Sequence, residues 1–333
     1  MKKICIVLLT IFLLPFTGCS QQKITSADIF AMDTIITIKL PKDKADEGFA
    51  LVQEEITRLE NTFSVTKSQS EIYQLNHKEG KPVALSEEVF SLIQKAERIK
   101  SLTAGAFDCS VYSLMQAWGF FEKSYHTPDE QTLQNLVEAL SSPVMNPETF
   151  EVSTLSGIDL GGIAKGYSAT LLAEKLKNIG VTSGVLSLGG NVQLIGSKPD
   201  GSPWMVGITN PFSPQEILFS LSLRDTAVVT SGSYQRYFET EGVVYHHILD
   251  PKTGYPANNG LSSVTVITPD GAWADGFSTA LYVMGTEEAL RFAKTQKDVG
   301  FILITDNQKI YVSSSLKSAV HSTVAGNYTW IYL

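Results

Sequence analysis

Hydrophobic and polar residues follow two periods along this chain, one typical of strands and one typical of helices. Residues 33–40 alternate Thr and Ile, which predicts a strand. Residues 46–62 place their apolar side chains at helical spacing, which predicts a helix. Ser86 is a good N-cap, and Glu87 and Glu88 follow it in the first turn of a helix expected to reach about Leu102. The N-terminal third is therefore predicted to be mixed.

The pattern changes after Asp159, where a glycine-rich turn precedes a predicted helix over residues 164–179. Two short strands are expected within residues 184–196, on either side of Gly189 and Gly190. Short β-branched segments between turn residues then predict strands at 204–209, 217–223, 227–230, 234–239, 243–248 and 262–268. Helices are expected at 272–284 and 287–295, and a closing hairpin at 301–305 and 309–312. We find no repeat of fixed period and no linker, so the fold class predicted is a single α+β domain with an antiparallel-rich sheet and flanking helices.

The N-terminus has the layout of a secretory signal. Lys2 and Lys3 precede an apolar run over residues 4–14, which is shorter than the roughly 20 residues of a membrane-spanning helix. The following Thr-Gly-Cys resembles a bacterial lipobox that ends at Cys19, with Phe16 where Leu is usual. We predict a lipoprotein signal peptide at 1–18, lipidation of Cys19, an anchor-proximal tether at 19–29 and the folded domain at 30–333. A cleaved signal with a soluble product is the alternative.

Charge and cysteine content narrow the class of function. The 26 Lys and Arg residues against 34 Asp and Glu give a net charge of -8, without the basic stripe that nucleic-acid binding requires. Cys5 would leave with the signal peptide and Cys19 would be acylated, so Cys109 would remain alone. We therefore expect no disulfide and no nucleic-acid partner, and a lone Cys is more often a buried apolar residue than a nucleophile.

The segment from Asp159 to Tyr167 contains three glycines where a strand gives way to a helix. Such a junction offers free backbone N–H groups and a positive helix end to a phosphate, and Lys165 adds a full charge. The spacing from Gly161 to Gly166 imitates a P-loop, but Tyr167 stands where that motif needs Lys. The pattern also differs from the dinucleotide-binding fingerprint. A pyrophosphate site and a simple tight turn are both compatible with it.

Asp275 and Thr279 lie at positions i and i+4 of a predicted helix, on one face. A carboxylate and a hydroxyl stacked in this way supply hard oxygen ligands of the kind that Mg²⁺ prefers. The alternative is that Asp275 caps the helix while Thr279 bonds back to the preceding turn.

His246 and His247 end a predicted strand before a loop with two prolines. Adjacent strand residues point to opposite faces, so a metal site using both histidines is not expected. The ordinary pKa of imidazole makes His247 a candidate general base, although a histidine at a strand end is more often structural.

These segments, taken in order, resemble the ApbE family of FAD:protein FMN transferases over residues 30–305. The collinear matches are Ala31 to Thr34, Thr103 to Asp108, Trp118 to Phe120, Asp159 to Tyr167, Ser187 to Asn191, Thr230 to Tyr234, His247 to Gly254 and Ala274 to Thr279. The resemblance implies FAD contacts at Met32, Ala106, Phe107, Asp108, Asp159, Lys165 and the backbone near Leu249. It also implies a magnesium ion held by Asp275, Thr279 and the main-chain oxygen of Gly162. Val65 departs from the aromatic residue common in the family near this position, so no flavin contact is assigned there.

The activity implied is Mg²⁺-dependent transfer of the FMN moiety of FAD to a Thr or Ser hydroxyl of a client flavoprotein, with release of AMP. The client would be an exported or membrane redox protein. The enzyme itself would be exported and lipid-anchored to the bacterial cell membrane, on its periplasmic or extracytoplasmic face. Such chemistry depends on positioning and electrostatic stabilisation. We assign to His247 the hypothesis that it takes the hydroxyl proton.

Three other functions are compatible with parts of the sequence. Water attacking the FAD pyrophosphate at the same site would give a hydrolase that releases FMN and AMP. Residues 64–67 spell S-x-x-K and residues 252–254 spell K-T-G, as in penicillin-interacting serine enzymes, but the S-D-N element is missing between them. A lipid-anchored protein that binds flavin without turnover is the third alternative.

Overall fold

The computed structural model describes residues 23–322 and 328–333. The predicted signal peptide at 1–18 and the predicted lipidation site Cys19 lie outside these residues. The first strand begins at Ile24, inside the range predicted as a tether, and pairs along its length with the second strand. No helix within the described ranges has both the length and the apolar character needed to cross a bilayer.

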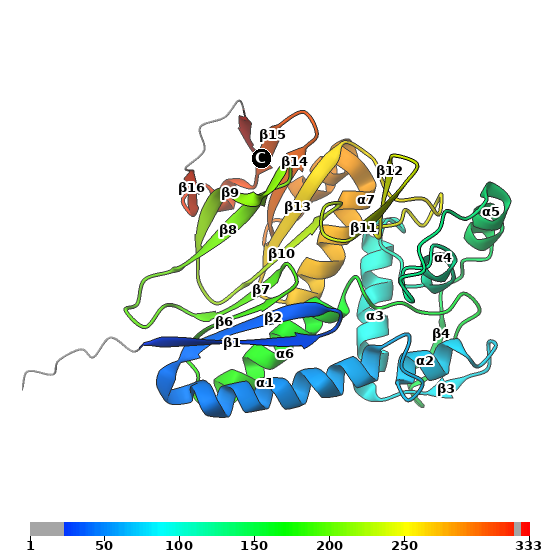
Figure 1. The fold of residues 1–333 in the computed structure, drawn as a ribbon, viewed down its shortest axis with the longest axis horizontal. Coiled ribbons are helices and arrows are strands. Elements are labelled where there is room, and N and C mark those ends of the chain that lie inside the picture. Colours follow the sequence, from blue (N-terminus) through cyan, green and yellow to red (C-terminus); the bar gives the residue numbers. More distant parts are fainter. Residues whose placement is uncertain (1–22, 323–327) are drawn as a thin grey trace, which may run out of the picture.

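A nine-stranded sheet runs through the molecule (Figure 1). Each strand is antiparallel to its neighbours, except that the last two are parallel to each other. In order across the sheet the strands are β1 (Ile24–Ala31), β2 (Thr34–Pro41), β6 (Ser183–Leu188), β7 (Asn191–Gly196), β10 (Ala227–Gly232), β13 (Leu261–Thr268), β14 (Gly300–Thr305), β15 (Lys309–Val312) and β17 (Thr329–Tyr332). The prediction of an antiparallel-rich sheet is confirmed.

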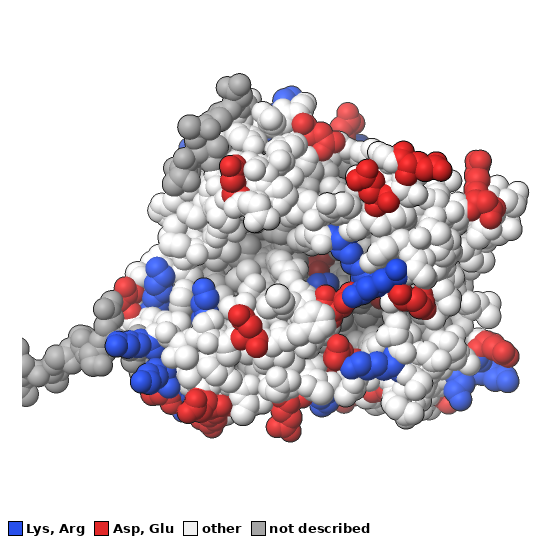
Figure 2. Space-filling view, viewed as in Figure 1, with Lys and Arg blue, Asp and Glu red and all other residues white. Residues whose placement is uncertain are grey.

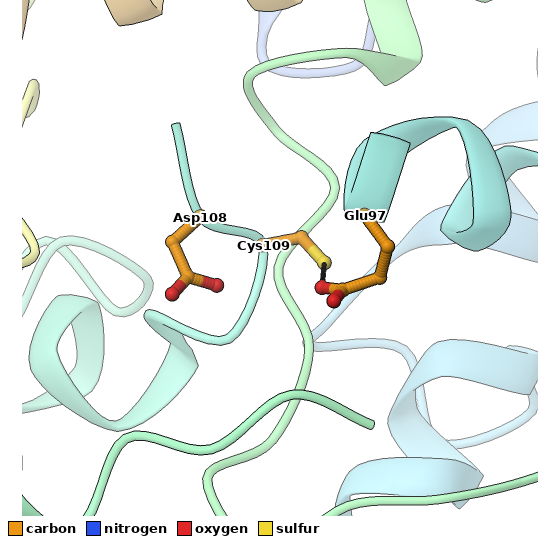
Figure 3. Close-up of side chains that lie close together, drawn as sticks. All are labelled: Glu97, Asp108 and Cys109. Atoms are coloured by element: carbon orange, nitrogen blue, oxygen red, sulfur yellow. Dashed lines mark hydrogen bonds between the residues drawn. The ribbon is translucent and has the colours of Figure 1, made fainter. Parts of the chain in front are cut away.

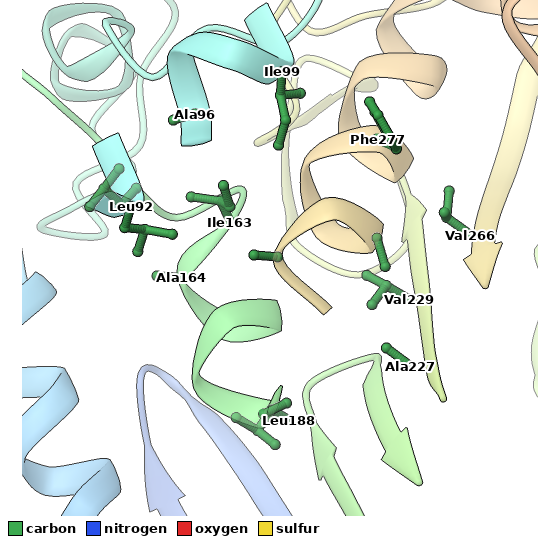
Figure 4. Close-up of a cluster of buried hydrophobic side chains, with 14 of the residues drawn as sticks. Leu92, Ala96, Ile99, Ile163, Ala164, Leu188, Ala227, Val229, Val266 and Phe277 are labelled. Atoms are coloured by element: carbon green, nitrogen blue, oxygen red, sulfur yellow. The ribbon is translucent and has the colours of Figure 1, made fainter. Parts of the chain in front are cut away.

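Three long helices pack against the sheet: α1 (Lys42–Phe63), α6 (Ala164–Asn178) and α7 (Gly271–Thr295). A fourth, α3 (Glu87–Leu102), packs against α7. The main hydrophobic core lies among them. Figure 4 shows Ile99 of α3, Phe277 of α7 and Val229 of β10 in this core. Burial of so much apolar surface is the dominant stabilising contribution, and it fixes where α6 and α7 meet the sheet.

The opposite face of the sheet carries a second core. Along β10, Val229 belongs to the core under the helices, whereas Val228 belongs to the second core. Because successive strand residues point to opposite faces, a strand buried on both sides is apolar at consecutive positions. The second face is covered by a three-stranded sheet made of β8 (Trp204–Asn210), β9 (Ser213–Leu223) and β16 (Val320–Ser322).

Smaller elements surround one end of the main sheet. An aromatic cluster around Trp118 joins α4 (Tyr112–Ala117) and α5 (Glu130–Glu138) to the hairpin of β11 (Tyr237–Thr240) and β12 (Val243–His246). The remaining elements are α2 (Glu71–Asn76), β3 (Val83–Ala84), β4 (Val144–Asn146), β5 (Glu151–Ser153) and the short 3₁₀ turn η1 (Ser314–Leu316).

The predicted strands and long helices are present, with two differences in detail. The two helices expected at the C-terminal third form one element, α7, with a break at Gly285, whose φ of 73° is outside the helical region. Several elements were not predicted, namely the strands β1, β3, β4, β5, β16 and β17 and the short helices α2, α4 and α5.

Candidate active site

A cavity of about 550 Å³ opens where the β1–β2 turn, the N-terminus of α6, β10 and α7 converge. Figure 2 shows this face of the molecule hollowed, with charged side chains of both signs gathered beside the hollow. Every predicted site residue within the described ranges lines this cavity: Met32, Ala106, Phe107, Asp108, Asp159, Gly162, Lys165, His247, Leu249, Asp275 and Thr279. Segments far apart in the sequence therefore meet at one place. The individual roles of these residues stay predictions.

Two glycines let α6 and α7 approach closely enough to build the polar end of the cavity. A Cβ added to Gly166 would lie 2.0 Å from the carbonyl oxygen of Gly271, and one added to Gly271 would lie 2.4 Å from the oxygen of Gly166. Real Cβ atoms do not come this close to backbone, so any side chain at either position would separate the helices. This crossing brings Asp275 of α7 to the first turn of α6.

Asp275 caps α6 rather than its own helix. Its Oδ2 accepts a hydrogen bond of 2.9 Å from the N–H of Gly166, and the side chain is only 4% exposed. The N-cap of α6, Ile163, offers no capping side chain. The N-cap of α7 is Asp270, which accepts from Ala272 and Trp273. The alternative that Asp275 caps its own helix is therefore wrong, and the carboxylate is held at the positive end of α6.

Hydroxyl and carbonyl oxygens lie beside this carboxylate. A Cβ built at Gly162 would be 3.6 Å from Thr279 Oγ1, so the backbone of the glycine-rich turn approaches the α7 hydroxyl. Ser231 of β10 lies between Thr279 and Ser278, with Oγ atoms 3.5 Å and 2.8 Å away. Asp275, Thr279 and the Gly162 main chain thus bring hard oxygen donors to one end of the cavity, and this donor set fits Mg²⁺.

The glycine-rich turn is held by its own polar groups. Asp159 Oδ1 accepts from the N–H of Gly161 at 2.9 Å, and Lys165 Nζ donates to the carbonyl of Gly161 at 3.0 Å. Burial raises the pKa of Asp159, while the Gly161 N–H and the charges of Lys165 and Arg236 act in the opposite direction. A carboxyl and an ammonium group therefore flank the start of α6, at the wall where a phosphate would meet the helix N-terminus.

His247 and His246 face different environments, as strand geometry predicts. His246 is buried against the ring of Tyr282, and its Nε2 contacts the carbonyl of Ala257 at 2.9 Å. His247 lines the cavity, and its Nδ1 lies 3.0 Å from the carbonyl oxygen of Arg236. A carbonyl only accepts, so Nδ1 carries the hydrogen and Nε2 keeps its lone pair. Burial lowers the pKa of His247 to about 3, and Lys165 and Arg236 act in the same direction.

A group of charges at the cavity edge was not predicted from the sequence. Asp33 pairs with Lys123 at 2.7 Å and with Arg236 at 3.8 Å, and all three residues line the cavity. Arg236 also donates to the carbonyl of Phe120. Met32 and Asp33 have φ values of 50° and 58°, and the N–H of Met32 donates to Glu60 at 2.9 Å. Arg236 lies just beyond the Thr230 to Tyr234 motif, and no local spacing connects it to Asp33.

One other group of acidic and thiol side chains occurs in the part of the chain that the structure describes: Glu97, Asp108 and Cys109. Figure 3 shows Cys109 directed at Glu97, with Asp108 on the other side of the cysteine. Lys100 already neutralises Asp108 at 2.7 Å. Burial raises the pKa of the Cys109 thiol, which disfavours the thiolate that a nucleophile or a metal ligand requires. Cys109 is the buried apolar residue that the sequence favoured.

The penicillin-enzyme alternative is wrong on geometry. Lys67 Nζ is held by Glu60 at 2.7 Å and by Asn61 at 2.9 Å, so its ammonium is engaged away from a role as base. Ser64 accepts from the N–H of Lys67 at 3.1 Å, just beyond the end of α1. Residues 252–254 lie in a turn closed by the bond from Gly254 N to Asp250 O, whereas the motif requires a strand.

Comparisons with known proteins agree with this arrangement. The model of the ApbE family matches residues 32–303. An FAD:protein FMN transferase of Klebsiella pneumoniae (strain 342) is 34% identical over 304 residues, which cover 89% of this chain and 93% of the relative. A Vibrio cholerae enzyme of the same name is 35% identical over 86% of this chain and 90% of its own length. The crystal structure of the ApbE protein of Thermotoga maritima superposes with a TM-score of 0.84 at 30% identity, covering 89% of this chain and 99% of that protein. From the family match, the identities and the shared fold, we conclude that the chain belongs to the ApbE family.

Proposed function

We propose that this protein is an FAD:protein FMN transferase, which moves the FMN moiety of FAD to a Thr or Ser hydroxyl of a client protein and releases AMP. Two observations support the proposal. Relatives that match almost the whole chain carry that enzyme name. The cavity also combines a helix N-terminus, a lysine and a cluster of oxygen donors, which are the groups that bind and activate a pyrophosphate.

Magnesium fits the polar end of the cavity. Asp275, Thr279 and the Gly162 carbonyl are the groups that would hold it, because they offer one carboxylate, one hydroxyl and one main-chain oxygen, and all three residues line the cavity. When bound, Mg²⁺ would neutralise negative charge on the pyrophosphate oxygens. The Gly166 N–H bond fixes the Asp275 carboxylate before any ligand arrives, so little reorganisation is needed.

The chain's own groups then orient the reacting atoms. The N-terminus of α6 and Lys165 favour the charge that grows on the phosphate oxygens during transfer. The client hydroxyl oxygen forms a bond to the FMN phosphorus while the bond from that phosphorus to the bridging oxygen of AMP breaks. His247 Nε2 takes the hydroxyl proton, because Nδ1–H is committed to the Arg236 carbonyl. AMP leaves with the bridging oxygen.

We also propose that the mature enzyme is exported and anchored to the bacterial membrane through a lipid on Cys19. The support is the sequence alone, namely Lys2 and Lys3, the apolar run at 4–14 and the Thr-Gly-Cys ending. An exported location suits the exported or membrane redox protein proposed as client.

The test is an incubation of the mature protein with FAD, Mg²⁺ and a candidate client, followed by mass spectrometry of the client and chromatography of the nucleotides. A client that gains the mass of one FMN, with an equal amount of AMP, supports transfer. Free FMN and AMP with every tested client unmodified would make the protein a hydrolase. Bound FAD that stays intact would make it a flavin-binding protein without turnover.

A further inference from the structure

Asn191 has a buried side-chain amide on the cavity wall, and its nitrogen has no hydrogen-bond partner among the described residues. It begins β7, is 3% exposed and lines the cavity. Its Nδ2 makes no hydrogen bond to any residue that the structure describes. Unpaired buried donors are rare because each one loses its hydrogen bonds to water without replacement. Such a donor in a ligand cavity calls for a partner that arrives with the ligand.

The strand register explains why the Asn191 side chain has no polar neighbour on the adjacent strands. Its cross-strand neighbours are Leu188 on β6 and Val229 on β10, both almost fully buried in the main core. Paired residues in a sheet point to the same face, so Asn191 faces the helices among aliphatic side chains. Figure 4 shows Leu188 and Val229 in that core.

A second amide on the same strand face provides the contrast. Gln193 lies two positions further along β7 and is also buried, at 4% exposure. Its Oε1 accepts from Thr170 Oγ1 of α6 at 3.0 Å, and its Nε2 donates to the carbonyl of Leu194 at 3.4 Å. The amide of Gln193, outside the cavity, therefore has partners within the protein, whereas the Asn191 donor, which lines the cavity, has none among the described residues.

The surroundings of Asn191 indicate the kind of ligand atom it meets. Beside the Gly189–Gly190 turn that precedes it, the cavity is lined by Thr34, Thr230 and Gln235. Gln235 Nε2 donates to the carbonyl of Thr230 at 2.9 Å, and Thr34 packs against the Gly189 turn. Charged groups line the cavity as well: Lys165 and Asp275 come from the helices, and Asp33 and Arg236 are next in sequence to Thr34 and Gln235. As a neutral donor, the Asn191 amide suits the ring nitrogens and ring carbonyls of a heterocycle more than a phosphate.

We propose that Asn191 is an FAD-binding residue whose Nδ2–H donates to a ring nitrogen or ring carbonyl of the dinucleotide. The inference rests on the proposed function, since it takes FAD as the ligand. Flavin and adenine both carry such acceptors, so the chemistry is shared and the source of the acceptor is an experimental question. The amide is a binding residue and takes no part in proton transfer.

The decisive variant is Asn191→Leu, which keeps the shape of the side chain and removes the donor. Because its neighbours are aliphatic, the ligand-free variant should be at least as stable as the wild type. Its Kd for FAD should rise about tenfold, as expected for one lost hydrogen bond. A merely structural amide would give the reverse pattern, with lower stability and unchanged affinity. Ser183→Ala is the matched control, because Ser183 is also buried with an unpaired hydroxyl but does not line the cavity.

Calorimetric titrations with FAD, FMN and ADP, together with thermal unfolding without ligand, measure these effects. A weaker affinity for FAD and FMN alone would place the acceptor on the flavin, and a weaker affinity for FAD and ADP alone would place it on the adenine. Unchanged affinity for all three ligands would overturn the proposal, even if the client's KM rose. Failure of the wild type to bind FAD would instead remove the proposed function, which keeps the two tests apart.

Discussion

The close crossing of α6 and α7 at Gly166 leads to the sharpest prediction. In Gly166→Ala the new Cβ would lie 2.0 Å from Gly271 O, 2.6 Å from Gly271 C and 2.7 Å from Asp275 Cβ. Two of these atoms are backbone, so no side-chain rotation relieves the contact, and the helices must separate by roughly an ångström. That movement weakens the bond from Gly166 N to Asp275.

Overpacking of this kind costs about 1–3 kcal/mol, and weakening the cap adds about 1 kcal/mol. The better helix propensity of Ala offsets up to about 1 kcal/mol. We expect a net loss of about 2 kcal/mol, which lowers Tm by about 3 °C for a domain of this size. Misplacing the Asp275 carboxylate by about an ångström should reduce the transfer rate by up to about a hundredfold.

Gly48→Ala is the matched control for this variant. Its Cβ would lie 2.3 Å from Leu40 Cδ1, the far end of a flexible side chain, at a helix–sheet contact outside the cavity lining. Leu40 can rotate, so we expect a smaller fall in Tm and an unchanged transfer rate. Thermal unfolding and single-turnover transfer are measured on both variants. If Gly166→Ala were as stable and as active as Gly48→Ala, the assignment of the helix crossing to the site would be wrong.

Four further predictions address single groups. Asp275→Asn keeps an oxygen for the Gly166 N–H but loses the negative charge. Tm should therefore change by less than about 3 °C, while metal-dependent transfer falls by a factor of roughly 10²–10³. Full activity across a Mg²⁺ titration would contradict this prediction. Burial holds the pKa of His247 near 3, so its imidazole stays neutral through weakly acidic pH. The pH profile of kcat/KM should therefore show no decrease near pH 6.5 that depends on His247. The variant His247→Ala should lower the rate at every pH. Because the pKa of His247 is lower in the folded protein, the unfolded chain takes up the proton first as the pH falls. His247 therefore reduces folding stability as the pH falls from about 6.5 toward 3. Acid unfolding of His247→Gln should start at a lower pH than that of the wild type. Cys109→Ala should transfer FMN at the wild-type rate, and iodoacetamide should not label Cys109 in the folded protein; rapid labelling with loss of activity would contradict its buried, protonated state.

Local pattern was enough to predict much of the fold. Alternating Thr and Ile predicted β2, Ser86 with its acidic first turn predicted α3, and the two glycines at 189 and 190 predicted the β6–β7 hairpin. Each of these signals is carried by neighbouring residues, through periodicity, capping or turn conformation. The opposite orientations of His246 and His247 followed from strand geometry in the same way.

Local sequence patterns could not predict the contacts between segments that lie far apart in the sequence. Nothing near Gly166 or Gly271 indicates that they meet, and nothing near Asp275 indicates that it caps α6 rather than α7. The alternative that Asp275 caps its own helix failed because Asp270, five residues earlier, already does so. The Asp33 and Arg236 pair depends in the same way on tertiary packing alone.

Asn191 shows how a sequence motif acquires meaning only in the structure. The Ser187 to Asn191 segment was recognised as part of the family pattern, yet an Asn after two glycines is an ordinary hairpin residue. Its significance comes from the apolar neighbours that β6 and β10 supply and from the cavity it lines.

The most direct test of the account is a crystal structure of the protein with FAD and Mn²⁺, which replaces Mg²⁺ and is located by its anomalous scattering. We expect a single strong peak bounded by Asp275, Thr279 and the Gly162 carbonyl, in contact with the pyrophosphate at the N-terminus of α6. A peak at Glu97, Asp108 and Cys109, or FAD phosphates bound away from α6, would contradict it.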